Sequence, residues 1–208
     1  NQGPVATSMA SFETYQKEQA WVWEHLALTR AQVIAGPSDL ANAVTALCAE
    51  VLAAPSDPAK VLAEVAEMRS RIAAAKAPTG PWDAKIGPGR LQDIELLAQA
   101  GALIAGQAAQ DIPLGLHAAA EAGLITATEA ETLTQTYARC WALQCAGRLL
   151  SAKPLQEDTL GQAGAAFLAR ALGVADLPTL AAEMRQRYAQ AAAVIDKALA
   201  APQRKVDP

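Results

Sequence analysis

Prolines and glycines divide this chain into long stretches that end with helix signals. Residues 9–35 contain neither residue type. Gly36 and Pro37 follow, in the order that is typical just after the end of a helix, where glycine closes the last turn and proline prevents continuation. Asp57 before Pro58 has the pattern of an N-cap followed by a proline in the first turn. We therefore predict a long first helix over residues 9–35 and an all-α helical bundle of about eight helices.

The other helix boundaries follow from the same kinds of signal. Ser38 is expected to cap a second helix, and Thr126 with Glu129 forms a capping box. The predicted helices after Pro58 cover residues 91–104, a short stretch ending at Gly123, a long helix ended by Lys153 and Pro154, residues 160–172 closed by Gly173, and residues 178–201.

The apolar residues repeat with the period of a helix. They make up 52% of the chain and are mostly alanine and leucine, which have high helix propensity. In the helix after Pro58, four apolar side chains share one stripe that is expected to pack: Val61, Val65, Met68 and Ile72. The helix after Thr126 carries apolar residues at four-residue steps: Leu133, Tyr137, Trp141, Cys145 and Leu149.

Composition and charge argue against several classes of function. The net charge is −4, and no stretch concentrates lysine and arginine, so nucleic acid is not an expected partner. The most apolar stretch, residues 137–150, contains two arginines, so no membrane span is expected. The three cysteines are interpreted as buried thiols in a reducing cytoplasm, and with only two histidines no metal site is expected.

A long loop interrupts the helices at residues 78–89, where prolines and glycines gather around Trp82. A glycine-rich stretch that opens a helix can offer backbone N–H groups to a phosphate, and flanking cations add to the attraction. The loop is therefore a candidate nucleotide-binding or domain-interface element through Lys85, Gly87, Gly89 and Arg90. The alternative is a plain connector between helices.

Two segments together resemble one known family. The first is Asn1-Gln2-Gly3-Pro4-Val5-Ala6-Thr7-Ser8 running into Trp21-Val22-Trp23-Glu24-His25, and the second is Lys85-Ile86-Gly87-Pro88-Gly89-Arg90-Leu91-Gln92-Asp93-Ile94-Glu95. In order and spacing, both resemble the bacterial glutamine synthetase adenylyltransferases. Two positions depart from the family pattern, since Arg90 stands where a glycine is usual and Leu96 where a phenylalanine is usual.

The resemblance implies a role within a large two-headed enzyme. One nucleotidyltransferase domain of such enzymes attaches AMP from ATP to a tyrosine of glutamine synthetase, and a related domain removes it by phosphorolysis. This chain is more similar to the second, adenylylating half. The resemblance implies ATP and magnesium as cofactors of the parent protein. Its implied partners are an upstream nucleotidyltransferase domain, glutamine synthetase and a PII-type nitrogen-signalling protein in the cytoplasm.

The catalytic carboxylates of such enzymes do not occur in this sequence. A Gly-Ser followed by an Asp-x-Asp strand holds the metal ions in the family, and no such pair of motifs is present. The chain also begins without an initiator methionine, so we interpret it as part of a longer protein. Residues 1–20 are then expected to be the trailing edge of the nucleotidyltransferase domain and residues 21–208 a C-terminal helical bundle. We expect no catalytic residue here and no activity from this part alone.

The first helix carries most of the candidate interface residues. Trp21, Trp23, Glu24 and Arg30 could contact a base or the catalytic domain. Because Trp21 and Trp23 cannot share one helix face, one is expected in the bundle and the other toward the missing domain. His25 is expected to be a hydrogen-bonded packing residue.

Asp93 and Glu95 resemble a metal-binding pair, but their helical setting argues against one. At about 100° per residue the two side chains point roughly 200° apart, too far for one metal ion. Asp93 is expected to lie in the first turn of its helix, and both residues are counted as interface candidates. Two other functions remain open: an autonomous helical interaction module, and the related PII uridylyltransferase, which shares a Lys-x-Gly-x-Gly…Asp-Ile-Glu pattern.

Overall fold

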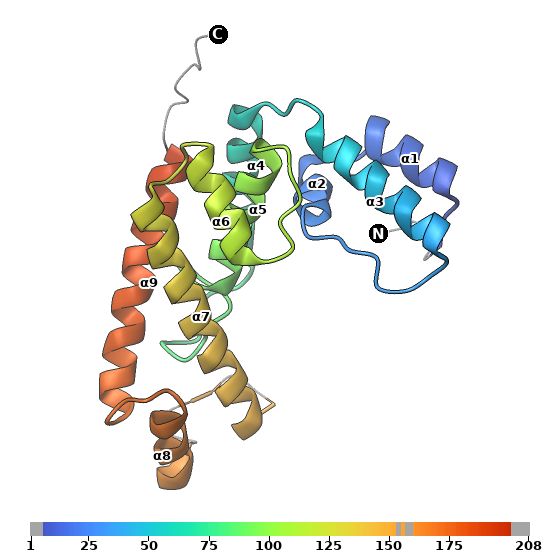
Figure 1. Cartoon of the computed structure of the whole chain (residues 1–208). Helices are drawn as coiled ribbons and strands as arrows, with labels where there is room; N and C mark the ends of the chain where they lie inside the picture. Colours follow the sequence, from blue (N-terminus) through green and yellow to red (C-terminus); the bar gives the residue numbers. More distant parts are fainter. Residues whose placement is uncertain (1–5, 153–154, 157–159, 201–208) are drawn as a thin grey trace.

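The computed structural model describes residues 6–152, 155–156 and 160–200. These residues form helices and no strand, which confirms the all-α fold class (Figure 1). The helices are α1 (Met9–Glu18), α2 (Val22–Leu28), α3 (Ser38–Ala53), α4 (Pro58–Ala75), α5 (Leu91–Ile104), α6 (Ile112–Glu121), α7 (Ala127–Leu150), α8 (Gly161–Ala171) and α9 (Leu177–Ala200).

The helices are arranged as an arm and a bundle (Figure 1). The arm consists of α1, α2 and α3 and projects to one side of the bundle formed by α4 to α9. Helices α7 and α9 run along the length of the bundle, with α8 at one end. Residues 76–90, which we call the connecting loop, join α4 to α5.

Helix α5 lies at the centre of the hydrophobic core. Its Ile94 and Leu97 belong to a cluster with α6, α7 and α9, while its Leu96 and Leu103 belong to a second cluster with α2, α3 and α4. Leu91 at its start joins a third cluster made by the connecting loop, α7, α8 and α9. One helix thus connects the arm to both ends of the bundle.

Most predicted helix ends are confirmed because they depend on local capping. The Asp57 carboxylate accepts a hydrogen bond from the Ala59 N–H at 2.9 Å at the start of α4. At α7 the Thr126 N–H donates to Glu129 Oε2 at 2.7 Å, and Thr126 Oγ1 accepts from the Glu129 N–H at 3.2 Å. Ser38 is the first residue of α3 and not its cap. Lys153 and Pro154 lie outside the described residues.

The single helix predicted over residues 9–35 was wrong, since the chain breaks after Glu18 and leaves helix again after Leu28. The Glu24 carboxylate turns back to the start of α2, where Oε2 accepts from the Trp21 N–H at 2.9 Å and Oε1 accepts from the Tyr15 hydroxyl at 2.6 Å. These bonds favour a new helix start over continuation of α1.

The row of apolar residues at four-residue steps along α7 leaves the core as it advances. Each four-residue step rotates about 40° past a full turn, so the row winds around the helix. Leu133 is buried, but Trp141 is 53% exposed and Leu149 is 78% exposed. The buried face runs instead through Thr136, Cys140 and Leu143, which follow an alternating spacing of four and three residues.

The three cysteines lie in different environments. Cys140 is buried, Cys48 is half-buried and Cys145 is exposed, so the prediction of buried thiols was wrong for Cys145. Burial raises the pKa of the Cys140 thiol to about 12, which keeps it protonated and unreactive at neutral pH. No helix within the described ranges has the length and apolar character needed to cross a membrane.

Candidate functional site

Arg90 holds the connecting loop against α9. Its side chain is 9% exposed, and Nη1 donates to the backbone oxygens of Gly80, at 2.9 Å, and Asp83. The guanidinium carbon lies 4.4 Å from the centre of the Tyr188 ring, a stacking cation–π contact. The Tyr188 hydroxyl donates to the Pro81 oxygen at 3.2 Å. The arginine that departs from the family pattern thus contacts both the loop and α9.

Gly89 lies where only glycine fits. Its φ is +69°, and a Cβ atom there would lie 2.0 Å from the Tyr188 backbone oxygen. The Gly89 N–H donates to Asp93 Oδ2 at 2.8 Å, so the protein's own carboxylate already binds this donor. Gly87 lies beside Arg90, and its φ of +126° also favours glycine.

Asp93 is the centre of an ion-pair network between helices. The residue is 7% exposed and lies in the first turn of α5, as predicted. Arg69 of α4 binds both of its oxygens, with Nη2 at 2.9 Å from Oδ2 and Nε donating to Oδ1. Arg69 Nη1 also lies 3.0 Å from Asp196 Oδ1 on α9. The carboxylate therefore joins α4, α5 and α9 and serves as a structural anchor.

Glu95 points to a different neighbour from Asp93. The Tyr137 hydroxyl of α7 donates to Glu95 Oε1 at 3.2 Å. Burial, and then the nearby Glu95 carboxylate, raise the pKa of Tyr137 to about 12. The two carboxylates contact α4 and α7 respectively, which agrees with the divergence expected for residues two apart on a helix.

Two cavities flank this region. One of about 250 Å³ lies where the arm meets the bundle, with Arg30, Gln99 and Tyr137 in its wall. The other, of about 380 Å³, lies between α4 and the connecting loop, and the Arg69–Asp93 pair forms part of its wall. Among the described residues, no group of three or more histidine, cysteine, aspartate or glutamate side chains could hold a metal ion.

Trp21 and Trp23 are both on the surface of the arm, with exposed fractions of 67% and 49%. The prediction that one of them is buried was wrong because the short α2 buries Leu26 and Leu28 instead. His25 Nε2 lies 3.0 Å from the Gln16 backbone oxygen, which fits the expected packing role.

The structure groups the candidate residues in three places. Gly87, Gly89, Arg90 and Asp93 meet at the inner side of the connecting loop, while Lys85 is exposed on its outer side. Trp21, Trp23 and Glu24 lie on the arm, and Arg30 lines the cavity beside Tyr137. Sequence reasoning missed Arg69, Tyr137 and Tyr188, since a partner 24 to 107 residues away leaves no local pattern.

Two family models match the chain. Residues 59–201 match the model described as GlnD PII-uridylyltransferase, and residues 1–47 match the one described as Glutamate-ammonia ligase adenylyltransferase. The exposed tryptophan pair lies in the second of these matches, and the connecting loop lies in the first.

Similar proteins include several named bifunctional glutamine synthetase adenylyltransferase/adenylyl-removing enzymes. The one from Rhizobium meliloti (strain 1021) is 42% identical over 141 residues, which are 65% of this chain and 14% of that protein. The one from Rhodopseudomonas palustris (strain TIE-1) is 32% identical over 200 residues, 94% of this chain and 20% of that protein. The one from Mesorhizobium japonicum is 48% identical over 107 residues, 51% of this chain and 11% of that protein. The chain spans a fifth or less of the length of these relatives.

Proposed function

The chain belongs to the glutamine synthetase adenylyltransferase family, and we propose that it docks onto the nucleotidyltransferase domain and completes it for adenylyl transfer. Its helical region belongs to the family described as GlnD PII-uridylyltransferase. The reaction served is transfer of AMP from ATP to a tyrosine hydroxyl of glutamine synthetase, in the control of nitrogen metabolism. Residues 1–20 end the nucleotidyltransferase domain in this proposal, and residues 21–208 form the helical domain that follows it.

The single observation that supports this role is the exposed tryptophan pair on the arm. Trp21 and Trp23 lie within the segment that matches the adenylyltransferase model, and both present their rings to solvent. Exposed tryptophans are enriched at protein interfaces because each buries a large area at low entropic cost. The Glu24 capping bonds hold this part of the arm in one conformation. The pair is the proposed contact to the nucleotidyltransferase domain.

The described residues at the inner side of the connecting loop do not fit a nucleotide–magnesium site. The Gly89 N–H is bound to Asp93, the Arg90 guanidinium is stacked on Tyr188, and the described residues hold no cluster of metal ligands. We therefore assign ATP, Mg²⁺ and the catalytic carboxylates to the preceding domain, where the metal would stabilise charge on the transferred phosphate. Glutamine synthetase and a PII-type signalling protein in the cytoplasm are the proposed partners.

A segment exchange in a complete relative tests the proposal. In the Rhodopseudomonas palustris enzyme, the matching 200 residues are replaced by this chain, and labelled AMP incorporated from ATP into glutamine synthetase is measured with Mg²⁺ present. We expect transfer by the exchanged enzyme and none by this chain alone. A folded exchanged enzyme that transfers no AMP would contradict the proposed function.

The tryptophan pair is tested in the same exchanged enzyme. Trp21→Ala with Trp23→Ala should lower the rate of AMP transfer at least about tenfold, because the domain contact loses its central aromatic area. Trp141→Ala is the matched control, since Trp141 is 53% exposed on α7, away from the arm. Equal rates of AMP transfer for the double variant and the control would contradict docking through the tryptophan pair. They would not contradict the proposed role in AMP transfer.

A second candidate function rests on the helical region. Because residues 59–201 match the model described as GlnD PII-uridylyltransferase, the helical region could instead complete a uridylyltransferase that modifies a PII protein. The same exchanged enzyme is offered labelled UTP and a PII protein. Transfer of UMP without transfer of AMP would favour this second function, and transfer of neither would favour an interaction module whose partner covers the exposed apolar side chains.

A further inference from the structure

The outer side of the connecting loop contains a pocket that the proposed function does not use. This pocket has a volume of about 110 Å³ and lies between the loop and the end of α7. Among the described residues, three basic side chains from different parts of the chain line it: Lys76 after α4, Lys85 in the loop and Arg148 in the last turn of α7. We call it the cationic pocket.

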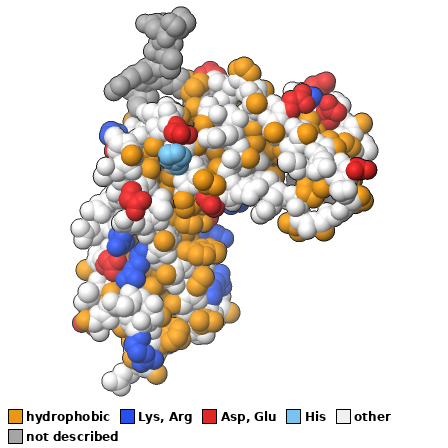
Figure 2. Space-filling model, in the orientation of Figure 1, with side chains coloured by type: hydrophobic (Ala, Val, Ile, Leu, Met, Phe, Trp, Pro, Cys, Tyr) orange, Lys and Arg blue, Asp and Glu red, His pale blue; other side chains and the backbone are white. Residues whose placement is uncertain are grey.

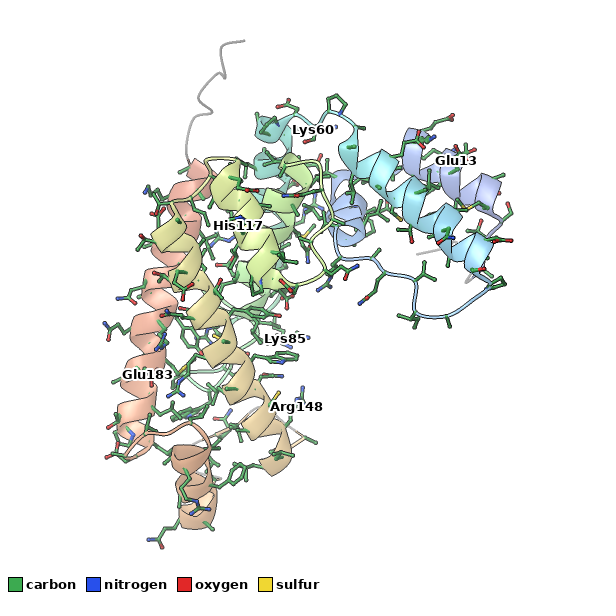
Figure 3. The ribbon with its side chains drawn as sticks, in the orientation of Figure 1. Glu13, Lys60, Lys85, His117, Arg148 and Glu183 are labelled. Carbon is green, nitrogen blue, oxygen red and sulfur yellow. The ribbon has the colours of Figure 1, made fainter. Side chains whose placement is uncertain are left out.

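The view with side chains shows two of these cations on one flank of the bundle (Figure 3). Lys85 and Arg148 lie on the same flank of α7, while Glu183 lies on the opposite side of the bundle and Lys60 at its far end. Arg148 Nη1 donates to the Ala152 backbone oxygen at 2.8 Å, which restrains the guanidinium. None of the three basic side chains forms an ion pair with another described residue.

Among the described lining residues, Asp83 has the single carboxylate, which accepts hydrogen bonds from backbone N–H groups and from the Thr79 hydroxyl. Asp83 Oδ1 accepts from the N–H groups of Lys85 and Ile86, each at 3.2 Å. Asp83 Oδ2 accepts from the Thr79 N–H at 3.4 Å and from its hydroxyl at 3.5 Å. This carboxylate shapes the turn of the loop. Its single negative charge offsets one of the three basic side chains among the described lining residues, so positive charge remains in excess.

Basic side chains are also prominent on the surface of this part of the bundle. On the face shown in Figure 2, lysine and arginine gather on the lower half of the bundle, and aspartate and glutamate prevail above it and on the arm. The whole chain carries a net charge of −4, so this local excess of positive charge is not a consequence of composition. Cations held together in a concave site attract an anion, which relieves their mutual repulsion.

We propose that the cationic pocket binds a phosphate-type oxyanion. Thr79 and Gln144 add polar groups to the wall, and Trp82 and Leu143 add apolar surface. Pockets for whole drug-sized ligands have volumes of about 300–1,000 Å³, so about 110 Å³ suits one phosphate group and not a complete nucleotide. The ligand is inorganic phosphate or the phosphate end of a nucleotide whose base stays outside.

This inference does not rest on the proposed function, because charge attracts a phosphate group whatever reaction the chain serves. Amide NMR of this chain, titrated with sodium phosphate at constant ionic strength, gives the measurement. We expect saturable shifts at the backbone amides of Thr79, Lys85 and Arg148. The double variant Lys85→Ala/Arg148→Ala should weaken binding at least about tenfold, as loss of two charge-assisted contacts predicts.

The matched control removes the same charge elsewhere. Lys60→Ala/Arg185→Ala changes two exposed basic residues outside the pocket and should bind phosphate like the unchanged chain. Lys76→Ala alone, at an exposed position after α4, should weaken binding severalfold and gives a second readout if the double variant folds poorly. Shifts that stay linear with phosphate, or that are equal in the double variant and the control, would overturn the proposal.

A parallel titration with ATP distinguishes the two sources of the phosphate group. Shifts at the same amides with at least tenfold tighter binding would assign the site to nucleotide polyphosphates. Equal affinities for ATP and phosphate would assign it to inorganic phosphate. Binding of ATP elsewhere, with no shift at these amides in either titration, would contradict the site itself.

Discussion

Arg90 connects the loop to α9 through one side chain. Its Nη1 binds two backbone oxygens of the connecting loop, and its plane stacks on Tyr188 of α9. A lysine can keep the charge but cannot reproduce the planar stacking or the paired donors. The effect of a conservative change therefore separates shape from charge at this position.

Arg90→Lys is predicted to lower the free energy of unfolding by about 1–3 kcal/mol, because the partly buried backbone oxygens of Gly80 and Asp83 lose their partner. Denaturant unfolding followed by circular dichroism measures the change. Arg185→Lys, at an exposed position of α9, is the control and should change stability by less than about 0.5 kcal/mol. Equal effects of the two substitutions would show that Arg90 acts through its charge alone.

Gly89 combines a left-handed backbone with a close neighbour, and a matched glycine separates the two effects. Gly173 has a φ of +64°, and a Cβ atom added there would meet no other part of the protein within 4 Å. Gly89 has a φ of +69°, and a Cβ atom added there would lie only 2.0 Å from the Tyr188 backbone oxygen. Gly173→Ala should cost about 1–2 kcal/mol for conformation alone.

Gly89→Ala should cost at least about 2 kcal/mol more than Gly173→Ala, because the backbone of α9 must also move. Thermal and denaturant unfolding of both variants provide the comparison. Similar losses for the two would mean that the loop can shift away from α9 freely, and that the contact seen at Gly89 contributes little to stability.

Residues whose partners are local could be predicted from sequence, and those with distant partners could not. The Asp93 position in the first turn follows from the helix start at Leu91. Its pairing with Arg69 depends on how α4 packs on α5, and nothing in either helix alone indicates it. The burial of Arg90 was missed for the same reason, since its contact with Tyr188 crosses almost a hundred residues.

At the scale of elements, helix starts were predicted better than helix breaks. Thr126 and Glu129 have the residue types of a capping box, so the start of α7 could be predicted. The start of α2 uses Trp21 at the N-cap, a residue type with no capping preference, and depends on the Glu24 carboxylate. The bond from the Tyr15 hydroxyl reinforces this break, but no proline or glycine marks it.

Helices α7 and α9 are joined by a partly buried ion network. Glu183 of α9 pairs with Arg139 of α7, at 2.7 Å between Nη2 and Oε2, and with Arg187 one turn along α9. Arg139 Nη1 also donates to the Leu172 oxygen at 2.7 Å, which closes the end of α8. Burial acts to raise the pKa of Glu183, but the two guanidinium groups outweigh it, and the pKa is lowered overall.

Glu183→Gln is predicted to lower the free energy of unfolding by about 1–3 kcal/mol at pH 7, since two arginines lose a charged acceptor. The pKa of the Glu183 carboxyl is lower in the folded chain than in the unfolded chain. The stabilisation by its ion pairs is therefore fully present at pH values above the unfolded pKa. It is lost as pH falls through the folded pKa. The difference between the variant and the unchanged chain should therefore shrink in acid. Denaturant unfolding at a series of pH values measures it.

Glu18→Gln provides the control for this network, because Glu18 is exposed at the end of α1. Its effect should stay below about 0.5 kcal/mol at every pH. A Glu183→Gln effect that persists unchanged in acid would mean that the glutamate contributes by shape and hydrogen bonding, and not by its charge.

The whole molecule combines an arm that carries the tryptophan pair with a bundle that carries the cationic pocket. The all-α class could be predicted, because Ala- and Leu-rich stretches with clear stops favour helix throughout. The projection of the arm could not, since it depends on the break after α1 and on how α2 and α3 pack against α4 and α5. The exposure of both tryptophans follows from that packing and not from residue type.

Arm and bundle share core residues through α5, which predicts that they unfold together. Leu52 of α3 is fully buried in the cluster that includes Leu96 and Leu103 of α5, and Leu180 of α9 is fully buried at the other end of the molecule. Leu52→Ala and Leu180→Ala should each lower the free energy of the same unfolding transition by about 2–5 kcal/mol.

Two probes distinguish a single transition from two. Fluorescence of the tryptophans includes a signal from Trp21 and Trp23 on the arm, and far-UV circular dichroism reports on all helices. Coincident curves for the unchanged chain and both variants are expected, because α5 cannot lose its arm contacts without exposing residues that also pack in the bundle. If Leu52→Ala instead unfolds the arm at a lower denaturant concentration than the bundle, the arm is an independently unfolding unit. Docking through the tryptophan pair would then include the free-energy cost of folding the arm.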